Sequence, residues 1–343
     1  MEKVRWGVLG VARIATEKVI PAMQRGEMCD LVGIASRDRA KAESAARRLG
    51  LPKAYGSYEE MLADPGIDAV YNPLPNHLHV SVSIQAAEAG KHVLCEKPLG
   101  MGVADTLELI AARDRTGVTI GEAFMVRAHP QWGRVIDMVR SGRIGQLRYA
   151  VGSFGYFNQD PKNIRNIAEY GGGALMDIGC YPIKTSRMVF GEEPRRVAGA
   201  VVRDPNFGTD VLASGVLEYP AGHCVFSCST QAVANQGMQF MGTTGRIEMP
   251  IPFNAIPGEK MRILIDDGKD LRRSTVIVEE VEACDQYTLQ GDLFSRAIRE
   301  GSEPPVPLED SLRNMAVIGA LFRSAETGRW EEPEAVLRAV AAG

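Results

Sequence analysis

Residues 4–15 read V-R-W-G-V-L-G-V-A-R-I-A. The run 4–9 is mostly apolar and too short for a helix, which predicts a buried strand. After it, Gly10, Ala12 and Ala15 stand where the G-x-G-x-x-G dinucleotide fingerprint has its glycines. In such a turn small residues permit a tight bend and let the backbone approach a pyrophosphate, and the next helix points its N-terminus at the phosphates. A strand-to-helix turn that binds nothing is the alternative reading of this degraded motif.

The alternation of short apolar runs with helical stretches continues to residue 122. We expect strands at 4–9, 31–35, 68–71, 92–95 and 118–121, and helices at 13–24, 38–49, 57–63, 78–89 and 103–115. This rhythm predicts an α/β Rossmann domain over residues 1–122, with a doubly wound parallel sheet that helices cover on both faces.

In residues 123–343, strand follows strand. We expect helices at 130–141, 171–189, 286–300 and 308–326, and strands at 146–157, 195–202, 211–219, 223–230, 237–241, 245–249, 262–266 and 274–281. The pattern predicts an α+β domain with a large, mostly antiparallel sheet. If one face of that sheet carries no helices, it needs a cover, so we expect a homodimer or homotetramer formed through residues 195–282.

Composition excludes several classes of protein. The 343 residues suit two domains, and 39 Lys and Arg against 43 Asp and Glu give a formal charge of -4, which disfavours nucleic acid as a partner. No apolar run approaches the ~20 residues of a membrane span and no signal-peptide pattern is visible, so we expect a cytoplasmic protein without a membrane partner. The six cysteines form no C-x-x-C pair and the five histidines no H-E-x-x-H element, so we expect reduced thiols and no metal site.

The end of the second expected strand bears on the choice of cofactor. A site that prefers NAD usually has an acid there for the ribose 2′-hydroxyl. This chain has Ser36 and Arg37 instead, and Arg39 and Lys41 add positive charge that suits a 2′-phosphate. NADP is therefore the preferred cofactor, while Asp38 keeps NAD as an alternative, and a solvated helix start is the reading without a ligand.

Two further segments follow expected strands and so lie at the carboxyl edge of the sheet, where open α/β sheets bind their ligands. The first runs from Pro73 to His79, where Asn76 either caps the next helix or contacts a cofactor. The second contains Glu96 and Lys97, and a lysine at this place can orient substrate hydroxyls and lower the pKa of a neighbouring acid.

A glycine-rich entry to a helix, G-G-G-A-L-M-D-I-G-C-Y-P over residues 171–182, provides a third candidate site. In an α-helix Asp177 and Tyr181 would share one face, which suits a carboxylate that holds substrate beside a phenol that transfers a proton. A helix cap and a core tyrosine are the structural alternative. Upstream, Asn163 and Arg165 are candidates for holding substrate oxygens, and a surface salt bridge is the alternative for Arg165.

Several motifs carry a resemblance that spans nearly the whole chain: the fingerprint start, E-A-F-M-V-R-A-H-P-Q at 122–131, E-K-P at 96–98, D-I-G-C-Y at 177–181 and F-M-G-T-T-G-R-I-E at 240–248. In this combination the chain resembles the Gfo/Idh/MocA family of nucleotide-dependent oxidoreductases. The segment 122–131, and N-I-R with G-G-G-A-L-M-D-I-G-C-Y-P-I within 163–183, are most similar to the branch of the D-xylose dehydrogenases, dimeric dihydrodiol dehydrogenases and glucose-fructose oxidoreductase.

The resemblance implies a Rossmann domain followed by an open-faced sheet that often forms the oligomer interface. The family's E-K-P lysine falls on Lys97, whose bond to proline is often cis in relatives, and its D-x-x-x-(H/Y) pair falls on Asp177 and Tyr181. Tyrosine at the last position favours the aldose and dihydrodiol branch. Ala12 replaces the middle fingerprint glycine, which this branch tolerates. Val126 and Ala128 stand where close relatives often have Tyr and His, which leaves the identity of the substrate open.

We therefore expect an NAD(P)-dependent oxidoreductase that moves a hydride between nicotinamide and a sugar, cyclic polyol, dihydrodiol or related carbonyl compound, with Lys97, Asp177 and Tyr181 as catalytic residues. The expected cofactor contacts are Gly10, Ala12, Arg13, Ile14, Ser36, Arg37, Lys41, Leu74, Pro75, Asn76, His79, Glu96, Lys97 and Arg127, and the expected substrate contacts are Lys97, Asn163, Arg165, Asp177 and Tyr181.

Two other functions remain open. An NAD-dependent glycosidase of the same fold would release a sugar leaving group without net cofactor turnover. A non-enzymatic dinucleotide sensor would have no need of a proton-transfer pair.

Overall fold

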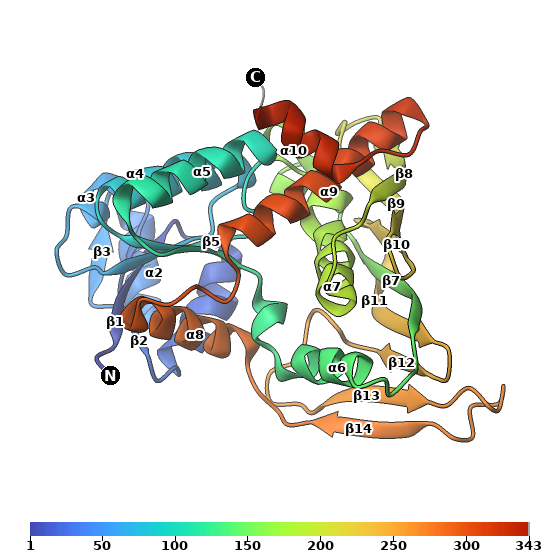
Figure 1. Cartoon of the computed structure of the whole chain (residues 1–343). Helices are drawn as coiled ribbons and strands as arrows, with labels where there is room; N and C mark the ends of the chain where they lie inside the picture. The colour runs from blue at the N-terminus through green and yellow to red at the C-terminus, as the bar shows by residue number, and fades with distance from the viewer. Residues whose placement is uncertain (342–343) are drawn as a thin grey trace. The chain divides into compact units, whose positions relative to one another are not determined.

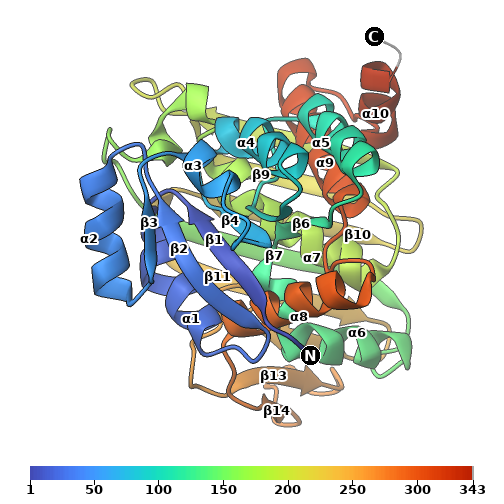
Figure 2. The same cartoon turned by 90° about the vertical axis from the view of Figure 1, so that its left-hand side faces the viewer.

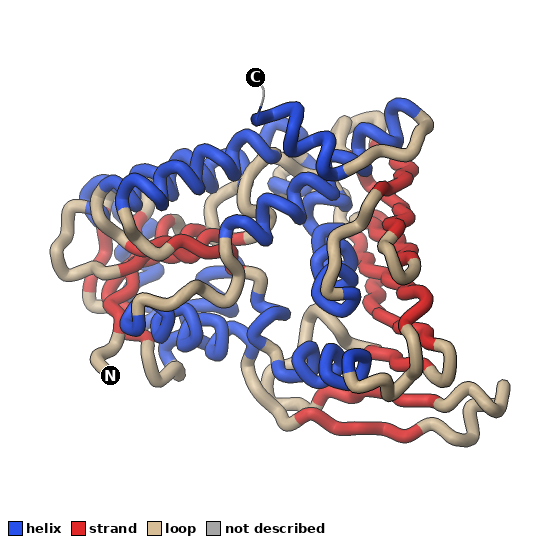
Figure 3. Tube along the Cα trace, in the orientation of Figure 1, coloured by secondary structure: helices blue, strands red, loops and turns tan. Residues whose placement is uncertain are grey.

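The structure, a computed structural model, describes residues 1–341 and divides into two compact units. The first unit consists of Met1–Ala128 and Asp285–Leu312, and the second of His129–Cys284 and the described residues from Arg313 onward. Figure 1 labels the helices and strands, and Figure 3 separates them by colour.

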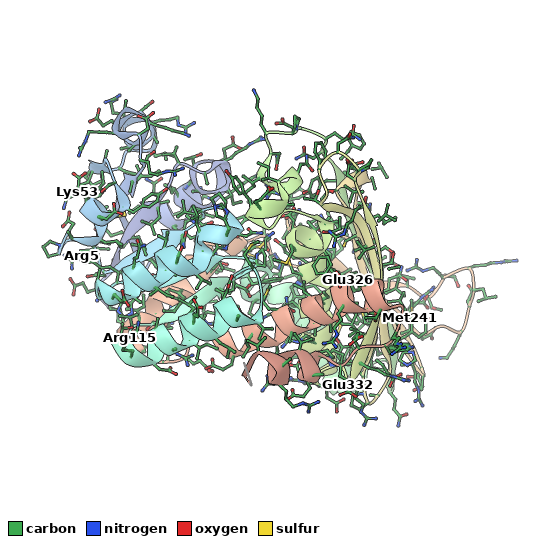
Figure 4. The ribbon with its side chains drawn as sticks, turned by 90° about the horizontal axis from the view of Figure 1, so that it is seen from above. Arg5, Lys53, Arg115, Met241, Glu326 and Glu332 are labelled. Atoms are coloured by element: carbon green, nitrogen blue, oxygen red, sulfur yellow. The ribbon has the colours of Figure 1, made fainter. Side chains whose placement is uncertain are left out.

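Six parallel strands form the sheet of the first unit, in the order β3-β2-β1-β4-β5-β6. Figure 2 labels all of them except β5. They are β1 (Val4–Leu9), β2 (Cys29–Ala35), β3 (Lys53–Tyr55), β4 (Ala69–Asn72), β5 (His92–Glu96) and β6 (Ile120–Ala123). The predicted doubly wound parallel sheet is confirmed. Only β3 was not predicted, because three residues show too little periodicity; its first residue, Lys53, lies at the periphery of the unit (Figure 4).

Helices cover both faces of this sheet and bury a separate core on each. Buried residues of α3, α4 and α5 pack with Leu9 and Val70 on one face, and those of η1, α1, α2 and α8 pack with Trp6 and Val8 on the other. The bounds of these helices, with the short helix η2, are η1 (Ala15–Val19), α1 (Ile20–Gln24), α2 (Arg39–Leu49), α3 (Tyr58–Leu62), α4 (Asn76–Glu88), α5 (Val103–Thr116), η2 (Met125–Ala128) and α8 (Gln286–Glu300).

The helix α8 corrects the predicted division into residues 1–122 and 123–343. The Trp6 indole donates a hydrogen bond to Ser295 Oγ at 3.0 Å, and its ring lies 5.8 Å from that of Phe294. Asp292 accepts the backbone N–H of Met28 at 2.8 Å. The segment 285–312 therefore completes the core of the first unit, so the second unit is not one continuous segment.

Eight strands form the sheet of the second unit, in the order β14-β13-β12-β11-β7-β10-β9-β8. Only β7 and β10 pair in parallel, so the predicted mostly antiparallel sheet is confirmed. The strands are β7 (Leu147–Phe157), β8 (Arg196–Arg203), β9 (Asp210–Glu218), β10 (His223–Ser229), β11 (Gln231–Gly242), β12 (Arg246–Met249), β13 (Met261–Asp266) and β14 (Ile277–Val281).

The second unit contains the predicted helices, together with two short segments between residues 164 and 170 and a last helix that were not predicted. They are α6 (Pro130–Arg140), η3 (Ile164–Asn166), η4 (Ala168–Tyr170), η5 (Leu175–Gly179), α7 (Cys180–Phe190), the part of α9 (Leu308–Thr327) from Arg313 onward, and α10 (Pro333–Ala341). The helix α10 was not predicted.

One face of the eight-stranded sheet is buried and the other is open. On β10, Cys224, Phe226 and Cys228 are buried while the residues between them are exposed, as the period of a strand requires. The buried face packs against α6 through Trp132, whose ring lies 6.3 Å from that of Phe240. On the opposite face Val225 is 44% exposed.

None of the helices within residues 1–341 combines the length and the apolar character that crossing a membrane requires. No group of three or more His, Cys, Asp or Glu side chains in the same residues is gathered as a metal site would require.

The packing of α8 leads to a stability prediction. Phe294→Ala should lower the free energy of unfolding of the first unit by about 3–5 kcal/mol, because the truncation opens a cavity beside Trp6. Urea denaturation followed by Trp fluorescence measures the change. Phe157→Ala, at a residue that is 66% exposed, is the control and should have little effect. Equal denaturation midpoints for Phe294→Ala and the wild type would contradict the assignment of this helix to the first unit.

Candidate functional site

The fingerprint turn of the first unit has room only for glycine at its first position. Gly10 has φ +89°, and its N–H donates to the carbonyl of Ala35 at 2.8 Å. A Cβ at this position would lie 2.9 Å from Leu74 Cδ2 and 3.7 Å from the Tyr58 hydroxyl. The carbonyl of Ala12 accepts the N–H of Thr16 at 3.0 Å, which begins the helical segment η1. A glycine cradle at a helix start fits a pyrophosphate.

The polar side chains after β2 differ in whether they have a partner within the chain. Ser36 Oγ accepts the N–H of Asp38 at 3.1 Å, and Asp38 in turn caps α2 by accepting the N–H of Lys41 at 3.1 Å. Arg39 forms an ion pair with Glu60 at 2.7 Å. Arg37 is exposed and has no ionic partner within residues 1–341. Asp38 is thus used as a helix cap, whereas the Arg37 guanidinium has no ionic partner in the described part of the chain.

Other expected cofactor contacts of the first unit have structural partners of their own. Arg13 is exposed and pairs with Glu17 at 2.8 Å. Ile14 packs against the core at the N-cap of η1, and Arg127 is exposed on η2. Asn76 is the first residue of α4 rather than its cap: Pro75 occupies the N-cap position and offers no side-chain hydrogen bond.

His79 holds two loops together. It is buried in α4, with Nδ1 2.9 Å from the carbonyl oxygen of Pro98 and Nε2 2.6 Å from that of Leu74. Burial lowers the pKa of His79 to about 4, against the opposing effect of the two carbonyls. A neutral ring has one N–H and donates to one of these carbonyls at a time. His79 therefore fixes the segment after β4 to the turn after β5.

The turn after β5 carries Glu96 and Lys97. Tyr71 Oη donates to Glu96 Oε1 at 2.6 Å, and the N–H of Lys97 donates to Glu96 Oε2 at 3.3 Å. Burial raises the pKa of Glu96, and the charge of Lys97 opposes that rise. The Lys97-Pro98 bond is cis, as the resemblance implied.

In the second unit Asp177 is the centre of a hydrogen-bonded group. Its Oδ2 accepts a hydrogen bond from Arg165 Nε at 2.9 Å and another from Tyr156 Oη at 2.7 Å. The negative charge of Asp177 raises the pKa of Arg165. The two predicted substrate contacts Arg165 and Asp177 are thus brought together. Arg165 does form a salt bridge, the structural alternative for it, but its partner is another candidate site residue. Tyr156, at the end of β7, was not predicted to belong to the site, although it follows Phe154 on the buried side of that strand.

Tyr181 is buried beside this group. Its ring packs at 5.3 Å against those of Phe154 and Phe253. The charge of Arg165 also interacts with Tyr181. The motifs alone suggested Lys97 as the cation for Tyr181, and the structure adds Arg165, a cation from the same unit as Tyr181.

A carboxylate from the sheet fixes the start of the helix that carries Asp177 and Tyr181. Asp210 Oδ2, on β9, accepts the N–H of Leu175 at 2.6 Å. Gly173 has φ +122°, and a Cβ there would lie 1.9 Å from Asp210 Oδ1, so only glycine leaves room for this carboxylate.

The first turn of this helix corrects the spacing argument. The segment η5 (Leu175–Gly179) is a π-helix, and α7 begins only at Cys180. The spacing was read as α-helical, whereas Asp177 lies in a π-turn and Tyr181 in the α-helix that follows it. Arg165 interacts with both side chains.

Two other residues of the second unit have structural roles. Asn163 Oδ1 accepts the N–H of Arg165 at 3.1 Å and caps η3. His129 is buried and caps α6 through Nδ1, which accepts the N–H of Gln131 at 3.2 Å. Burial lowers the pKa of His129 to about 4, so the ring is neutral near pH 7.

Comparison with known proteins gives family matches over both units. Residues 4–124 match the model described as an oxidoreductase family with an NAD-binding Rossmann fold, and residues 132–248 match the GFO/IDH/MocA C-terminal domain.

Three similar proteins span almost the whole chain. An uncharacterized oxidoreductase of Rhizobium meliloti is 51% identical over 332 residues, 96% of this chain and 99% of that protein. A D-xylose 1-dehydrogenase (NADP(+)) of Haloferax volcanii is 38% identical over 326 residues, 94% of this chain and 98% of that protein. The structure of KijD10, a 3-ketoreductase from Actinomadura kijaniata in complex with NADP and TDP-benzene, has a TM-score of 0.88 and 29% identity, and covers 94% of this chain and 98% of that one.

The resemblance seen in the sequence is thereby confirmed, over the fold as well as the motifs. The chain belongs to the Gfo/Idh/MocA family of oxidoreductases.

Proposed function

We propose that the protein is an NADP-preferring oxidoreductase whose substrate is a sugar, a cyclic polyol, a dihydrodiol or a related carbonyl compound. The observation that carries the proposal is a group of three side chains. Arg165 donates a hydrogen bond to Asp177, and its positive charge interacts with Tyr181. Such a group offers charged and hydroxyl partners for several substrate oxygens beside a phenol that can move a proton. Relatives named as a D-xylose 1-dehydrogenase (NADP(+)) and as a dTDP-3,4-didehydro-2,6-dideoxy-alpha-D-glucose 3-reductase support the same class of substrate.

The first unit supplies the cofactor site in this proposal. The turn at Gly10 would bind the pyrophosphate. Arg37 would bind the 2′-phosphate, because Asp38 accepts a backbone hydrogen bond and Arg39 is paired with Glu60. The exposed Lys41 adds to the local positive field, and Glu96 with Lys97 lies nearer the nicotinamide end. Bound NADP(H) accepts or supplies a hydride.

The second unit, with Lys97, supplies the proton chemistry. Tyr181 takes the proton of the substrate hydroxyl during oxidation and returns it during reduction. The positive charge of Arg165 supports its phenolate, and in this proposal Lys97 is the second cation, as the motifs suggested. Lys97 also polarises the reacting oxygen. Asp177 keeps Arg165 and Tyr156 in place and holds a neighbouring substrate hydroxyl, and Asn163 fixes the backbone from which Arg165 extends.

We further propose that the open face of the eight-stranded sheet joins a second copy of the chain. Tyr149, Val151 and Val225 are each more than a third exposed on this face. Val151 and Val225 are neighbours in register on β7 and β10. A contiguous apolar patch on a sheet face is typical of a symmetric interface.

Cofactor preference is tested at Arg37. Arg37→Ala should weaken NADP+ binding about tenfold or more while it leaves NAD+ binding nearly unchanged, because only the 2′-phosphate loses a charge-assisted hydrogen bond. Titration calorimetry with each dinucleotide measures both affinities. Arg48→Ala, in the last turn of α2, the helix that follows Arg37, is the control for a general loss of positive charge. Equal affinities of the wild type for NADP+ and NAD+ would contradict the proposal.

The role of Tyr181 is tested by the pH dependence of alcohol oxidation. The rate should rise on the alkaline side as the phenolate is populated, since free tyrosine titrates near ~10. Tyr181→Phe should remove this rise and lower the rate by about 10²–10⁴, and Lys97→Met should move the rise to higher pH. NADP+ affinity should survive in Tyr181→Phe. Tyr149→Phe, on the open sheet face, is the control. A Tyr181→Phe enzyme with wild-type turnover and an unchanged pH profile would contradict the assignment.

The assembly is tested by light scattering at micromolar concentration. The wild type should have at least twice the mass of one chain, and Val225→Lys should reduce it, because the new charge would be buried against the partner. Met101→Lys, at an exposed residue of the first unit, should not change the mass. A wild-type particle with the mass of one chain would rule out this interface.

A further inference from the structure

Tyr58, which entered neither the sequence predictions nor the proposed mechanism, lies at the fingerprint turn. It is the first residue of α3, and its ring packs against the core that contains Leu9 and Leu74. Its hydroxyl lies 3.7 Å from the place where a Cβ of Gly10 would be. The absent side chain of Gly10 thus leaves a space that the Leu74 side chain and the Tyr58 hydroxyl border.

The phenol of Tyr58 also lies within electrostatic range of Arg37, the cation of the same site. Burial raises the pKa of the Tyr58 phenol, and the charge of Arg37 opposes that rise, so the two side chains act on each other. Within residues 1–341 the hydroxyl makes no hydrogen bond. The nearby Tyr55 differs, because its hydroxyl donates to Asp64 Oδ2 at 2.7 Å. The O–H group of Tyr58 can therefore donate a hydrogen bond to a ligand at the edge of the site.

The turn that carries Tyr58 is held in place from both sides. Glu60 Oε2 accepts the N–H of Gly56 at 2.8 Å and pairs with Arg39 at 2.7 Å. Ser57 Oγ accepts the N–H of Glu60 at 3.1 Å and caps α3. Arg39 lies over Gly56, where a Cβ would come within 2.8 Å of its Nε. Because Arg39 fastens the turn to α2, the Tyr58 hydroxyl needs little ordering to bind a ligand.

We infer that Tyr58 is a specificity-determining residue for NADP, whose hydroxyl donates a hydrogen bond to the 2′-phosphate alongside Arg37. The position between the pyrophosphate turn at Gly10 and the cation at Arg37 is where the adenosine ribose of a Rossmann ligand lies. A neutral donor there adds a charge-assisted hydrogen bond to the phosphate, whereas NAD has only a hydroxyl at the same place. The inference rests on the proposed function, since it assumes that the first unit binds a dinucleotide.

The test is Tyr58→Phe, which removes the donor and leaves the ring on the core. We expect NADP+ affinity, measured by titration calorimetry on the full chain, to fall about tenfold, and NAD+ affinity to stay within a factor of about two. In the double variant with Arg37→Ala, the loss of NADP+ affinity should be smaller than the product of the two single losses, because both groups bind the same phosphate. The thermal midpoint should not change, because the hydroxyl has no partner to lose.

Tyr55→Phe is the matched control: it removes a hydroxyl that is bonded to Asp64 and should leave both affinities unchanged while it lowers stability. Unchanged NADP+ affinity in Tyr58→Phe would overturn the inference, and so would equal losses for NADP+ and NAD+, which would place the hydroxyl on a part that both ligands share. A wild-type chain that binds neither dinucleotide would instead overturn the proposed function.

Discussion

The hydrogen bond from the N–H of Leu175 to Asp210 fixes the candidate site of the second unit to its sheet. It satisfies a backbone donor at the start of a helix and places a negative charge at the positive end of that helix. Gly173 is required because any side chain would displace the carboxylate. Close by, the carbonyl of Arg165 accepts the N–H of Gly173 at 2.9 Å, so the same glycine run that admits Asp210 also fixes the backbone of the arginine that binds Asp177.

The sequence was sufficient for the parts of the fold that depend on local pattern. Alternating apolar runs and helical stretches predicted five of the strands around the Gly10 turn, and strand following strand predicted the second sheet. The short strand β3 lacked periodicity, and the return of α8 depends on the contact of Phe294 with Trp6, which are far apart in the chain. No local rule gives such a pairing, because it is decided by which apolar surfaces remain uncovered after the sheet has formed.

The same limit applies to the site. The motif and the family resemblance identified Asp177, Tyr181 and Lys97, and residue chemistry suggested Arg165. The link through Asp177 to Tyr156 and the cap supplied by Asp210 are contacts between segments that only the folded sheet brings together. The π-turn at η5 could not be expected from spacing that is read as α-helical. Likewise, Arg37 and Arg39 look alike in the sequence, and only Glu60 distinguishes them by pairing with one.

The central claim is that the chain transfers a hydride to NADP+ from a sugar-like alcohol. The most direct measurement incubates the purified protein with NADP+ and a panel of aldoses, cyclic polyols and trans-dihydrodiols, and follows both the nicotinamide absorbance and the products. The account predicts that one of these classes is oxidised with formation of one NADPH per product molecule, more slowly when NAD+ replaces NADP+. Release of a sugar leaving group without net NADPH, or binding of NADP+ with no oxidation of any class, would contradict it.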